Sequence, residues 1–441
     1  MKRRCIIIAA MLLLISNACV KRGINIKLSE RSVTRVINQM TAVMVHDVTN
    51  PPLAARFYAY ACLAGYEVVV QKKGLASMKG VLNEFPVIAK PGGIQTYDVY
   101  LSATLAIYRT AEALQPSGYI LKKDEDRFVD SCRSVGFSDA VISGSMAYAN
   151  LVSKAVLNYA KHDGYVKISN YQRYTPGLKP GMWNPTPPSY MAPVEPYFYT
   201  VRPFTLDSAS QFFTGNPVPF SLNKTSSFYK QMLESQKKGA DDLSREEIDA
   251  ANFWDCNPFA VKAAGHMLVG LKKISPGAHW MGICSIACLQ QKTGFVKALQ
   301  IHTILSVALT DGFISCWDSK YKTNRIRPET AIRDYLDRSW KPFLQTPPFP
   351  EYVSGHSVIS AVSANILSRF FGDHYGFTDS VESSYGIPPR RFNSFDQAAR
   401  EAALSRFYGG IHFMDAIEEG LIQGKKVGDR VADKFRLGRK L

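Results

Sequence analysis

The sequence lacks the patterns that mark a nucleic-acid-binding protein. Its 441 residues include 53 lysines and arginines against 37 aspartates and glutamates, which gives a formal net charge of +16 and a pI near 9.4. These basic residues are dispersed, with no zinc-finger spacing, no long lysine–arginine run and no basic motif interleaved with aromatic residues. The positive charge therefore favours an anionic surface or an oxyanion substrate, and we expect no nucleic-acid partner.

Cysteine is also scarce, and its placement indicates no metal motif. The eight cysteines are scattered, without a C-x2-C pair or another recognised ligand spacing. In an exported protein one or two disulfides can form between such residues, in pairings that the spacing does not define.

Long apolar runs are missing as well, except at the start of the chain. No later segment has the roughly 18 continuous apolar residues of a spanning helix. At the start, Lys2, Arg3 and Arg4 precede CIIIAAMLLLI, and SNAC ends at Cys19. This pattern is typical of a signal peptide, and Ala18-Cys19 resembles a bacterial lipobox. We predict a signal peptide over 1–19, with an uncleaved anchor as the alternative.

This N-terminal pattern also predicts a location. We expect an exported protein, either periplasmic or an outer-membrane lipoprotein of a Gram-negative bacterium, whose contact with a membrane is a lipid on Cys19.

Helical periodicity dominates the rest of the chain. Apolar residues recur at helical spacing in 28–48, 51–70 and 138–164, whereas alternating β-branched runs are rare. After the capping-box sequence SREE (244–247) we expect further helices over 247–254, 257–274 and 278–321. The fold class predicted is all-α, built of helical bundles, with an N-terminal helical region over 25–172 and a C-terminal one over 225–441.

A proline-rich connector separates the two helical regions. Residues 173–219 hold ten of the 24 prolines, and each proline removes an amide donor and fixes φ. Aromatic residues such as Trp183 and Tyr197 make a free linker a poor fit. We expect an irregular connector that packs on the helical body, with a part in walling a site as the alternative.

Three short clusters in the last third of the chain carry the chemistry. They are Lys320 followed after six residues by Arg327-Pro328, then Ser354-Gly355-His356, and finally Ser405-Arg406 followed after five residues by His412. The middle cluster precedes an apolar stripe at helical spacing that ends near Gly372, so its first residues stand at a predicted helix N-terminus.

Together these clusters suit a tetrahedral oxyanion. The lysine and the two arginines supply cations, and the planar guanidinium groups match anion oxygens. Ser354 adds a hydroxyl and Gly355 an approachable amide at a helix N-terminus, where anions are favoured. Of the two histidines, one can attack or ligate the central atom while the other moves a proton near neutral pH.

The ordered pattern K-x6-RP, SGH and SR-x5-H resembles one superfamily, the vanadium-dependent haloperoxidases and the type 2 phosphatidic acid phosphatases. The resemblance implies an all-α core that holds vanadate or phosphate. It also implies catalytic roles for His412 (apical vanadate ligand or phosphorylated nucleophile), His356 (general acid and base) and Lys320 (which would polarise the peroxide). The residues it implies around the vanadate oxygens are Lys320, Arg327, Ser354, Gly355 and Arg406.

Two positions depart from the family pattern. Val353 stands where the family usually has proline, although a β-branched residue can adopt the extended backbone needed there. Asp415 follows His412 by three residues, whereas the family usually has an acid four residues later. Because both spacings share a helix face, Asp415 is expected to orient an imidazole and is counted among the catalytic residues.

Neighbouring aromatic residues favour the haloperoxidase branch. Trp317 lies three residues before Lys320, and Phe349 in PPFPEY lies seven before His356; the resemblance implies a halide site at these two rings. We predict an enzyme that oxidises iodide or bromide with hydrogen peroxide, using vanadate. The alternative is an exported acid phosphatase that hydrolyses a phosphate ester through a phosphohistidine at His412, without vanadate.

Overall fold

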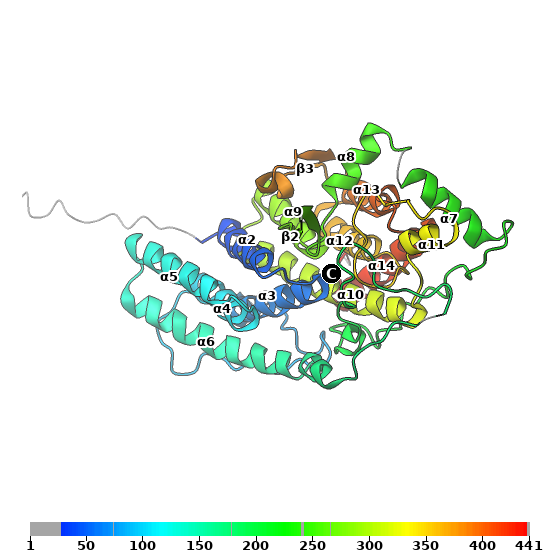
Figure 1. The fold of residues 1–441 in the computed structure, drawn as a ribbon. Helices are drawn as coiled ribbons and strands as arrows, with labels where there is room; N and C mark the ends of the chain where they lie inside the picture. The colour runs from blue at the N-terminus through cyan, green and yellow to red at the C-terminus, as the bar shows by residue number, and fades with distance from the viewer. Residues whose placement is uncertain (1–27, 74, 178, 240–241, 265, 439–441) are drawn as a thin grey trace, which may run out of the picture.

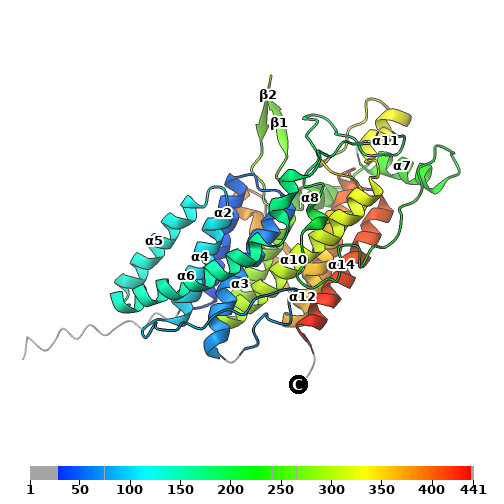
Figure 2. The same cartoon turned by 90° about the horizontal axis from the view of Figure 1, so that it is seen from below.

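Helices form most of the described chain, as predicted. The computed structural model describes residues 28–438 apart from 74, 178, 240–241 and 265. The earlier helices lie on one side and the later helices on the other, and the long helix α10 (Phe295–Thr323) runs between them (Figures 1 and 2). Because α10 packs against helices of both groups and is buried along most of its length, it is the central element of the core.

The first group contains the helices expected over 28–48, 51–70 and 138–164. Its members are α2 (Glu30–His46), α3 (Pro51–Lys73), α4 (Val99–Leu114), α5 (Tyr119–Ser134) and α6 (Asp139–Lys161). Ser29 caps α2 by accepting a hydrogen bond from the Arg31 amide. Helix α4 lies between α3 and α6, and α3 packs on α10.

The proline-rich segment that follows has little regular structure. After η1 (Tyr165–Asn170) it contains the short η2 (Phe198–Thr200) and becomes helical at α7 (Ser227–Lys238). Trp183 and Phe198 are fully buried. The Trp183 amide donates to the Asn324 carbonyl at 2.9 Å, so this segment packs directly against the chain that leaves α10.

The second group surrounds helix α12 (Gly355–Phe371), which packs on α10, on α13 (Phe395–Tyr408) and on α14 (Met414–Lys434). Three shorter helices complete it: α8 (Arg245–Phe253), whose capping box forms as predicted between Ser244 and Glu247, α9 (Pro276–Gln290) and α11 (Pro328–Tyr335). Between α12 and α13 lie β3 (Phe377–Asp379), η3 (Val381–Tyr385) and β4 (Arg390–Phe392).

The prediction of a helix over 257–274 is wrong. This segment forms an antiparallel hairpin of β1 (Val261–Ala264) and β2 (Met267–Gly270), which projects from the helical body (Figure 2). Val261 and Val269 are β-branched, and Gly270 has low helix propensity, so local preference favours strands. Met267 and Val269 are exposed, so these two side chains do not pack a helix onto the core.

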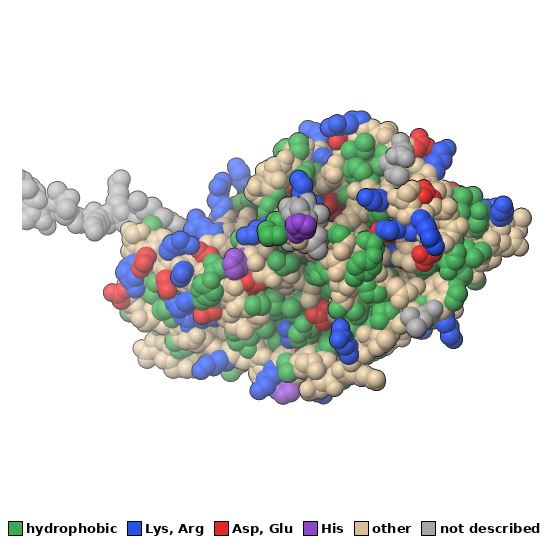
Figure 3. Space-filling model, in the orientation of Figure 1, with side chains coloured by type: hydrophobic (Ala, Val, Ile, Leu, Met, Phe, Trp, Pro, Cys, Tyr) green, Lys and Arg blue, Asp and Glu red, His purple; other side chains and the backbone are tan. Residues whose placement is uncertain are grey.

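In the part of the chain that the structure describes, three helices are long and apolar enough, by length and composition, to cross a membrane. In two of them, over Pro51–Gln71 and Phe295–Thr323, 94% of the apolar window is buried within the protein, and the third, over Asp139–Asn170, is 39% buried. The apolar character of the first two is therefore accounted for by the protein core. Figure 3 shows lysine and arginine side chains scattered over the surface, in keeping with the dispersed charge of the sequence.

Candidate active site

The three motif clusters meet at one end of the second helical group. Lys320 stands in the last turn of α10, Arg327 before α11, Ser354 before α12, Arg406 in the last turn of α13 and His412 just before α14. Gly355, His356, Arg406 and His412 line one pocket. Five helix ends thus bring together residues that lie up to 92 positions apart in the sequence.

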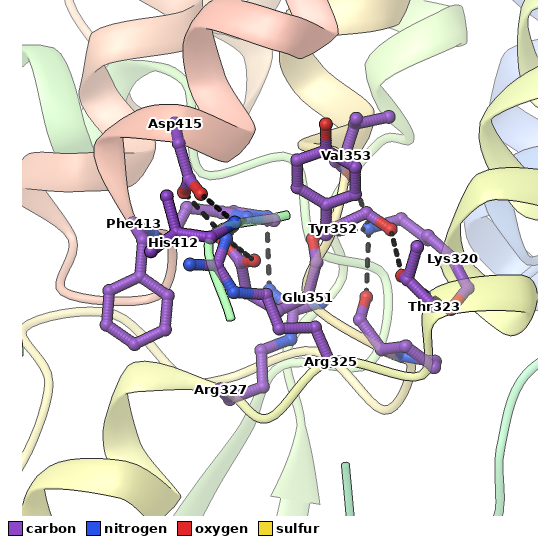
Figure 4. Close-up of polar contacts among 12 residues, drawn as sticks. Lys320, Thr323, Arg325, Arg327, Glu351, Tyr352, Val353, His412, Phe413 and Asp415 are labelled. Carbon is purple, nitrogen blue, oxygen red and sulfur yellow. Dashed lines mark hydrogen bonds and ion pairs between the residues drawn. The ribbon is translucent and has the colours of Figure 1, made fainter. Parts of the chain in front are cut away.

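His412 is held by a carboxylate on one side and an arginine on the other (Figure 4). Its Nδ1 lies 2.8 Å from Glu351 Oε1 and its Nε2 lies 3.0 Å from Arg327 Nη1. Burial, followed by the charges of Arg327 and Lys320, holds the pKa of His412 well below its usual range. The ring is therefore neutral, with the Nδ1 proton donated to Glu351 and a lone pair on Nε2.

Arg327 is fully buried and only partly hydrogen-bonded. Its Nε donates to the Phe349 carbonyl and its Nη1 to the Ile411 carbonyl, both at 2.9 Å. Its Nη2 has no partner among the described residues. A buried guanidinium donor without an acceptor is costly, so this group suits an anion oxygen.

Lys320 is also fully buried. Its Nζ donates to the carbonyls of Pro350, Glu351 and Val353 at 2.9, 3.0 and 2.6 Å. Val353, whose peptide bond with Tyr352 is cis, thus contributes its carbonyl to the site. Burial lowers the pKa of Lys320 to about 7, helped by the nearby Arg327 charge. A bound anion would favour the protonated form.

Ser354 and Gly355 form the start of α12, as predicted. Ser354 Oγ accepts a hydrogen bond from the Ser357 amide at 3.4 Å, as an N-cap does. A Cβ atom added to Gly355 would find its nearest neighbours at 3.9 Å, in Lys320 and Trp317. The glycine therefore leaves open space beside the lysine at a helix N-terminus.

His356 and Arg406 face each other across the pocket wall. Arg406 is buried, and its Nη1 lies 3.5 Å from His356 Nε2. Burial and the charge of Arg406 hold the pKa of His356 well below its usual range, so its imidazole is neutral in the anion-free protein.

Trp317 and Phe349 both line the pocket, with their ring centroids 5.1 Å apart. Trp317 Nε1 donates to the Val194 carbonyl at 3.2 Å, and the Val194 amide donates to the Pro348 carbonyl at 3.0 Å. The proline-rich segment therefore fixes the aromatic wall from behind.

Asp415 was expected to orient an imidazole, but in the structure it bonds to other residues than His412. Its Oδ1 accepts a hydrogen bond from Arg325 Nη1 at 2.6 Å, and Oδ2 accepts one from the Val218 amide at 3.2 Å. The i+3 spacing does place Asp415 in the first turn of α14. His412, however, precedes that helix, so the two residues do not share a helix face and the assigned orienting role falls to another carboxylate.

Glu351 is the functional residue that the sequence argument missed. Besides its contact with His412, it accepts hydrogen bonds from the Phe413 amide at 3.0 Å and from Arg325 Nη1 at 3.2 Å. It is fully buried. Its signal in the sequence is a single carboxylate within the apolar, proline-rich approach to Ser354.

The electrostatics of the cluster fit an oxyanion. Among the described residues, neither Lys320 nor Arg327 has a carboxylate within ion-pair distance, and Arg406 has only Asp255 at 3.9 Å. Burying cations without partners is unfavourable. The vacant Arg327 donor, the open space at Gly355 and the lone pair of His412 together match a tetrahedral anion bound to an imidazole.

An all-α body with buried cations and a neutral, carboxylate-oriented histidine defines the vanadate- and phosphate-binding class. Residues 300–437 match the family described as the VCPO second helical-bundle domain. The crystal structure of the first bacterial vanadium-dependent iodoperoxidase is 40% identical, with a TM-score of 0.89, over 95% of this chain and 100% of that one. The chain belongs to the vanadium-dependent haloperoxidase superfamily.

Two further structures share the fold at lower identity. The holo and apo forms of a bacterial vanadium-dependent chloroperoxidase are 15% and 16% identical, both with a TM-score of 0.66. Both matches cover 88% of this chain. They cover 92% of the holo chain and 94% of the apo chain. No curated protein sequence matches the chain.

Proposed function

We propose that this protein oxidises iodide with hydrogen peroxide, using vanadate held by the buried cations of its pocket. The observation that carries the proposal is the fully buried Lys320 and Arg327, which lack carboxylate partners among the described residues and lie beside the neutral imidazole of His412. The 40% identity to a bacterial vanadium-dependent iodoperoxidase supports the choice of iodide.

The residues present suit the vanadate ion. His412 Nε2 would supply the protein ligand, and the oxygens would be held by Arg327, Arg406 and the start of α12 at Ser354 and Gly355. Lys320, whose three N–H donors are bonded to backbone carbonyls, would contribute its positive charge beside them. When bound, vanadate would supply Lewis acidity toward hydrogen peroxide without a change of oxidation state.

The protein's own contribution is orientation, charge and proton transfer. Glu351 accepts the Nδ1 proton of His412 and so sets the tautomer with its lone pair on Nε2, the atom that faces Arg327. His356, neutral and half-buried at the pocket wall, would accept a proton from the entering peroxide. Trp317 and Phe349 would give the halide an apolar wall that excludes water.

The test is reconstitution of the purified apoprotein with orthovanadate, followed by triiodide formation with hydrogen peroxide. We expect vanadate-dependent turnover with iodide, lower turnover with bromide, and loss of both in His412→Ala. Absence of turnover with either halide would refute the proposal. Vanadate-inhibited hydrolysis of p-nitrophenyl phosphate in the same preparation, without peroxidase activity, would select the phosphatase alternative that the family assignment disfavours.

Export is a separate proposal. The charged start, the apolar run and the Ala18-Cys19 pair support a lipidated signal peptide. These residues lie outside the described part of the structure.

A further inference from the structure

A second cluster of ligand-type side chains lies directly behind the pocket wall. Cys256 Sγ is 3.3 Å from His279 Nδ1 and 3.6 Å from Glu382 Oε1, and His279 Nδ1 is 3.6 Å from the same Glu382 oxygen. All three residues are buried. They come from the loop after α8, from the first turn of α9 and from η3, so no local spacing in the sequence indicates the cluster.

These distances match the edges of a metal-centred tetrahedron. With zinc bond lengths of about 2.0–2.1 Å to nitrogen, 2.3 Å to sulfur and 2.0–2.2 Å to oxygen, tetrahedral angles separate sulfur from nitrogen or oxygen by about 3.5–3.6 Å and nitrogen from oxygen by about 3.3–3.5 Å. The three observed separations lie within about 0.3 Å of these values. One thiolate, one imidazole and one carboxylate form a ligand set that zinc accepts.

The histidine of the cluster turns one ring nitrogen to a carboxylate and the other to the two further candidate ligands. His279 Nε2 lies 2.7 Å from Asp379 Oδ2, and both side chains are fully buried. Since Asp379 can accept the Nε2 proton, Nδ1, which faces Cys256 and Glu382, would be the nitrogen that ligates a bound ion. A carboxylate behind a metal-bound histidine is the usual second-shell arrangement. Trp254 stacks on the ring at 4.7 Å and fixes its plane.

We propose that Cys256, His279 and Glu382 bind a zinc-type divalent ion, with Asp379 orienting His279 and a water completing the tetrahedron. The ion would neutralise the thiolate and the carboxylate that ligate it, both of which are buried close to Asp379.

The other cysteine cluster of the described chain, Cys284, Cys288 and His302, is less suited to an ion. His302 Nδ1 lies 2.8 Å from the Ala298 carbonyl and Nε2 lies 3.0 Å from Ser285 Oγ, so both ring nitrogens have partners outside the cluster, whereas His279 Nδ1 faces its own cluster. It serves as the internal comparison for the proposed site.

The ion would connect to the oxyanion pocket through residues 254–256. The Trp254 backbone hydrogen-bonds to His356, Asp255 lies 3.9 Å from Arg406, and Cys256 lines the pocket. Holding Cys256 therefore fixes the short segment that supports both His356 and Arg406. The role is structural and does not depend on the halide that the enzyme oxidises.

The test is metal analysis of the full chain, purified without chelators and then loaded with Zn²⁺ or Co²⁺. We expect one equivalent per chain and, with Co²⁺, tetrahedral d–d bands together with a thiolate charge-transfer band. Cys256→Ser should abolish that charge-transfer band, and Asp379→Asn should weaken Zn²⁺ binding by about 10–100-fold. The matched control Cys132→Ser, another buried cysteine outside both clusters, should change neither.

Two results would overturn the proposal. One is a wild-type protein that binds well below one equivalent of either ion. The other is a charge-transfer band that persists in Cys256→Ser and disappears in Cys288→Ser, which would place the ion in the comparison cluster. If Cys256→Ser fails to fold by circular dichroism, the near-isosteric Glu382→Gln decides: unchanged Zn²⁺ affinity in that variant refutes the site. None of these measurements requires peroxidase activity.

Discussion

Glu351 supports the candidate vanadate ligand from a position 61 residues earlier in the chain. One of its oxygens accepts hydrogen bonds from the His412 ring and the Phe413 amide, and the other accepts Arg325. The same carboxylate therefore sets the tautomer of His412, fixes the backbone after it and neutralises a buried arginine. A residue with three such roles is a stronger determinant of the site than its single contact with the imidazole suggests.

We expect Glu351→Gln to weaken vanadate binding by about 10–100-fold, as losses of second-shell partners do. The amide keeps one acceptor oxygen but removes the charge and directs an NH2 group at Arg325. Vanadate titration followed by halide turnover measures the change. Asp415→Asn is the matched control, since Asp415 shares Arg325 but not His412, and should lose less affinity. Equal losses in the two variants would contradict the assignment, provided that their melting temperatures agree.

Lys320 makes vanadate binding depend on pH. Its pKa in the anion-free protein is about 7, so the ammonium form is lost as the pH rises above that value. Affinity for the anion should therefore fall with rising pH, by up to about tenfold per unit. In Lys320→Arg the guanidinium stays protonated, and the fall should be smaller. Because vanadate itself titrates, the measured quantity is the difference between the two titration series over about pH 6–9. Parallel series would contradict the prediction.

The sequence motifs of the candidate site lie at helix ends in the structure. Ser354 and Gly355 could be placed from capping preference and the stripe that follows them, and the structure has them at the N-terminus of α12. The orienting acid could not be found in this way. Asp415 was the nearest carboxylate in sequence, whereas Glu351 reaches His412 through tertiary packing, for which local periodicity carries no signal.

At the scale of elements, the proline-rich segment is attached to the core by one buried carboxylate of α10. Asp311 Oδ1 accepts the Phe204 amide at 2.7 Å, and Oδ2 accepts the Thr205 amide at 2.8 Å and the Thr205 hydroxyl at 2.6 Å. Burial raises the pKa of Asp311 to about 6 despite these bonds, so the group is ionised at neutral pH. Three donors on one carboxylate give this segment a defined docking point on the central helix.

Asp311→Asn should lower the free energy of unfolding by about 1–3 kcal/mol, because the new NH2 group faces a buried donor and leaves it unpaired. Urea unfolding at neutral pH measures the loss. Asp207→Asn, on the same segment but with a side chain 67% exposed, is the control and should change stability by less than about 0.5 kcal/mol. A variant as stable as the wild type would show that the segment does not depend on Asp311.

The elements differ in how far periodicity could predict them. Helices with a buried stripe, such as α2 with Val33, Val36 and Met40, were found because one face packs on the core. The hairpin of β1 and β2 was not predicted, because it projects from the body and its conformation follows turn and strand preference. Apolar residues there suggested a buried helix, but Met267 is 65% exposed.

At the scale of the whole molecule, the described cysteines form no disulfide. All six are buried free thiols, namely Cys62, Cys132, Cys256, Cys284, Cys288 and Cys316. The open question of one or two disulfides in an exported chain is thus answered for this part of the molecule. Stability comes instead from a core built around α10, which is large enough to need no covalent cross-link.

The last prediction concerns where this body is held. The lipobox resemblance at Ala18-Cys19 predicts that the mature protein begins at a lipidated Cys19. Two or more acyl chains give stable membrane attachment, which a single chain does not. Expression in a Gram-negative host should therefore place the wild type in the membrane fraction and Cys19→Ser in the soluble one, with equal halide turnover per molecule. Recovery of the wild type in the soluble periplasm with an unmodified N-terminus by mass spectrometry would contradict lipidation and leave export intact.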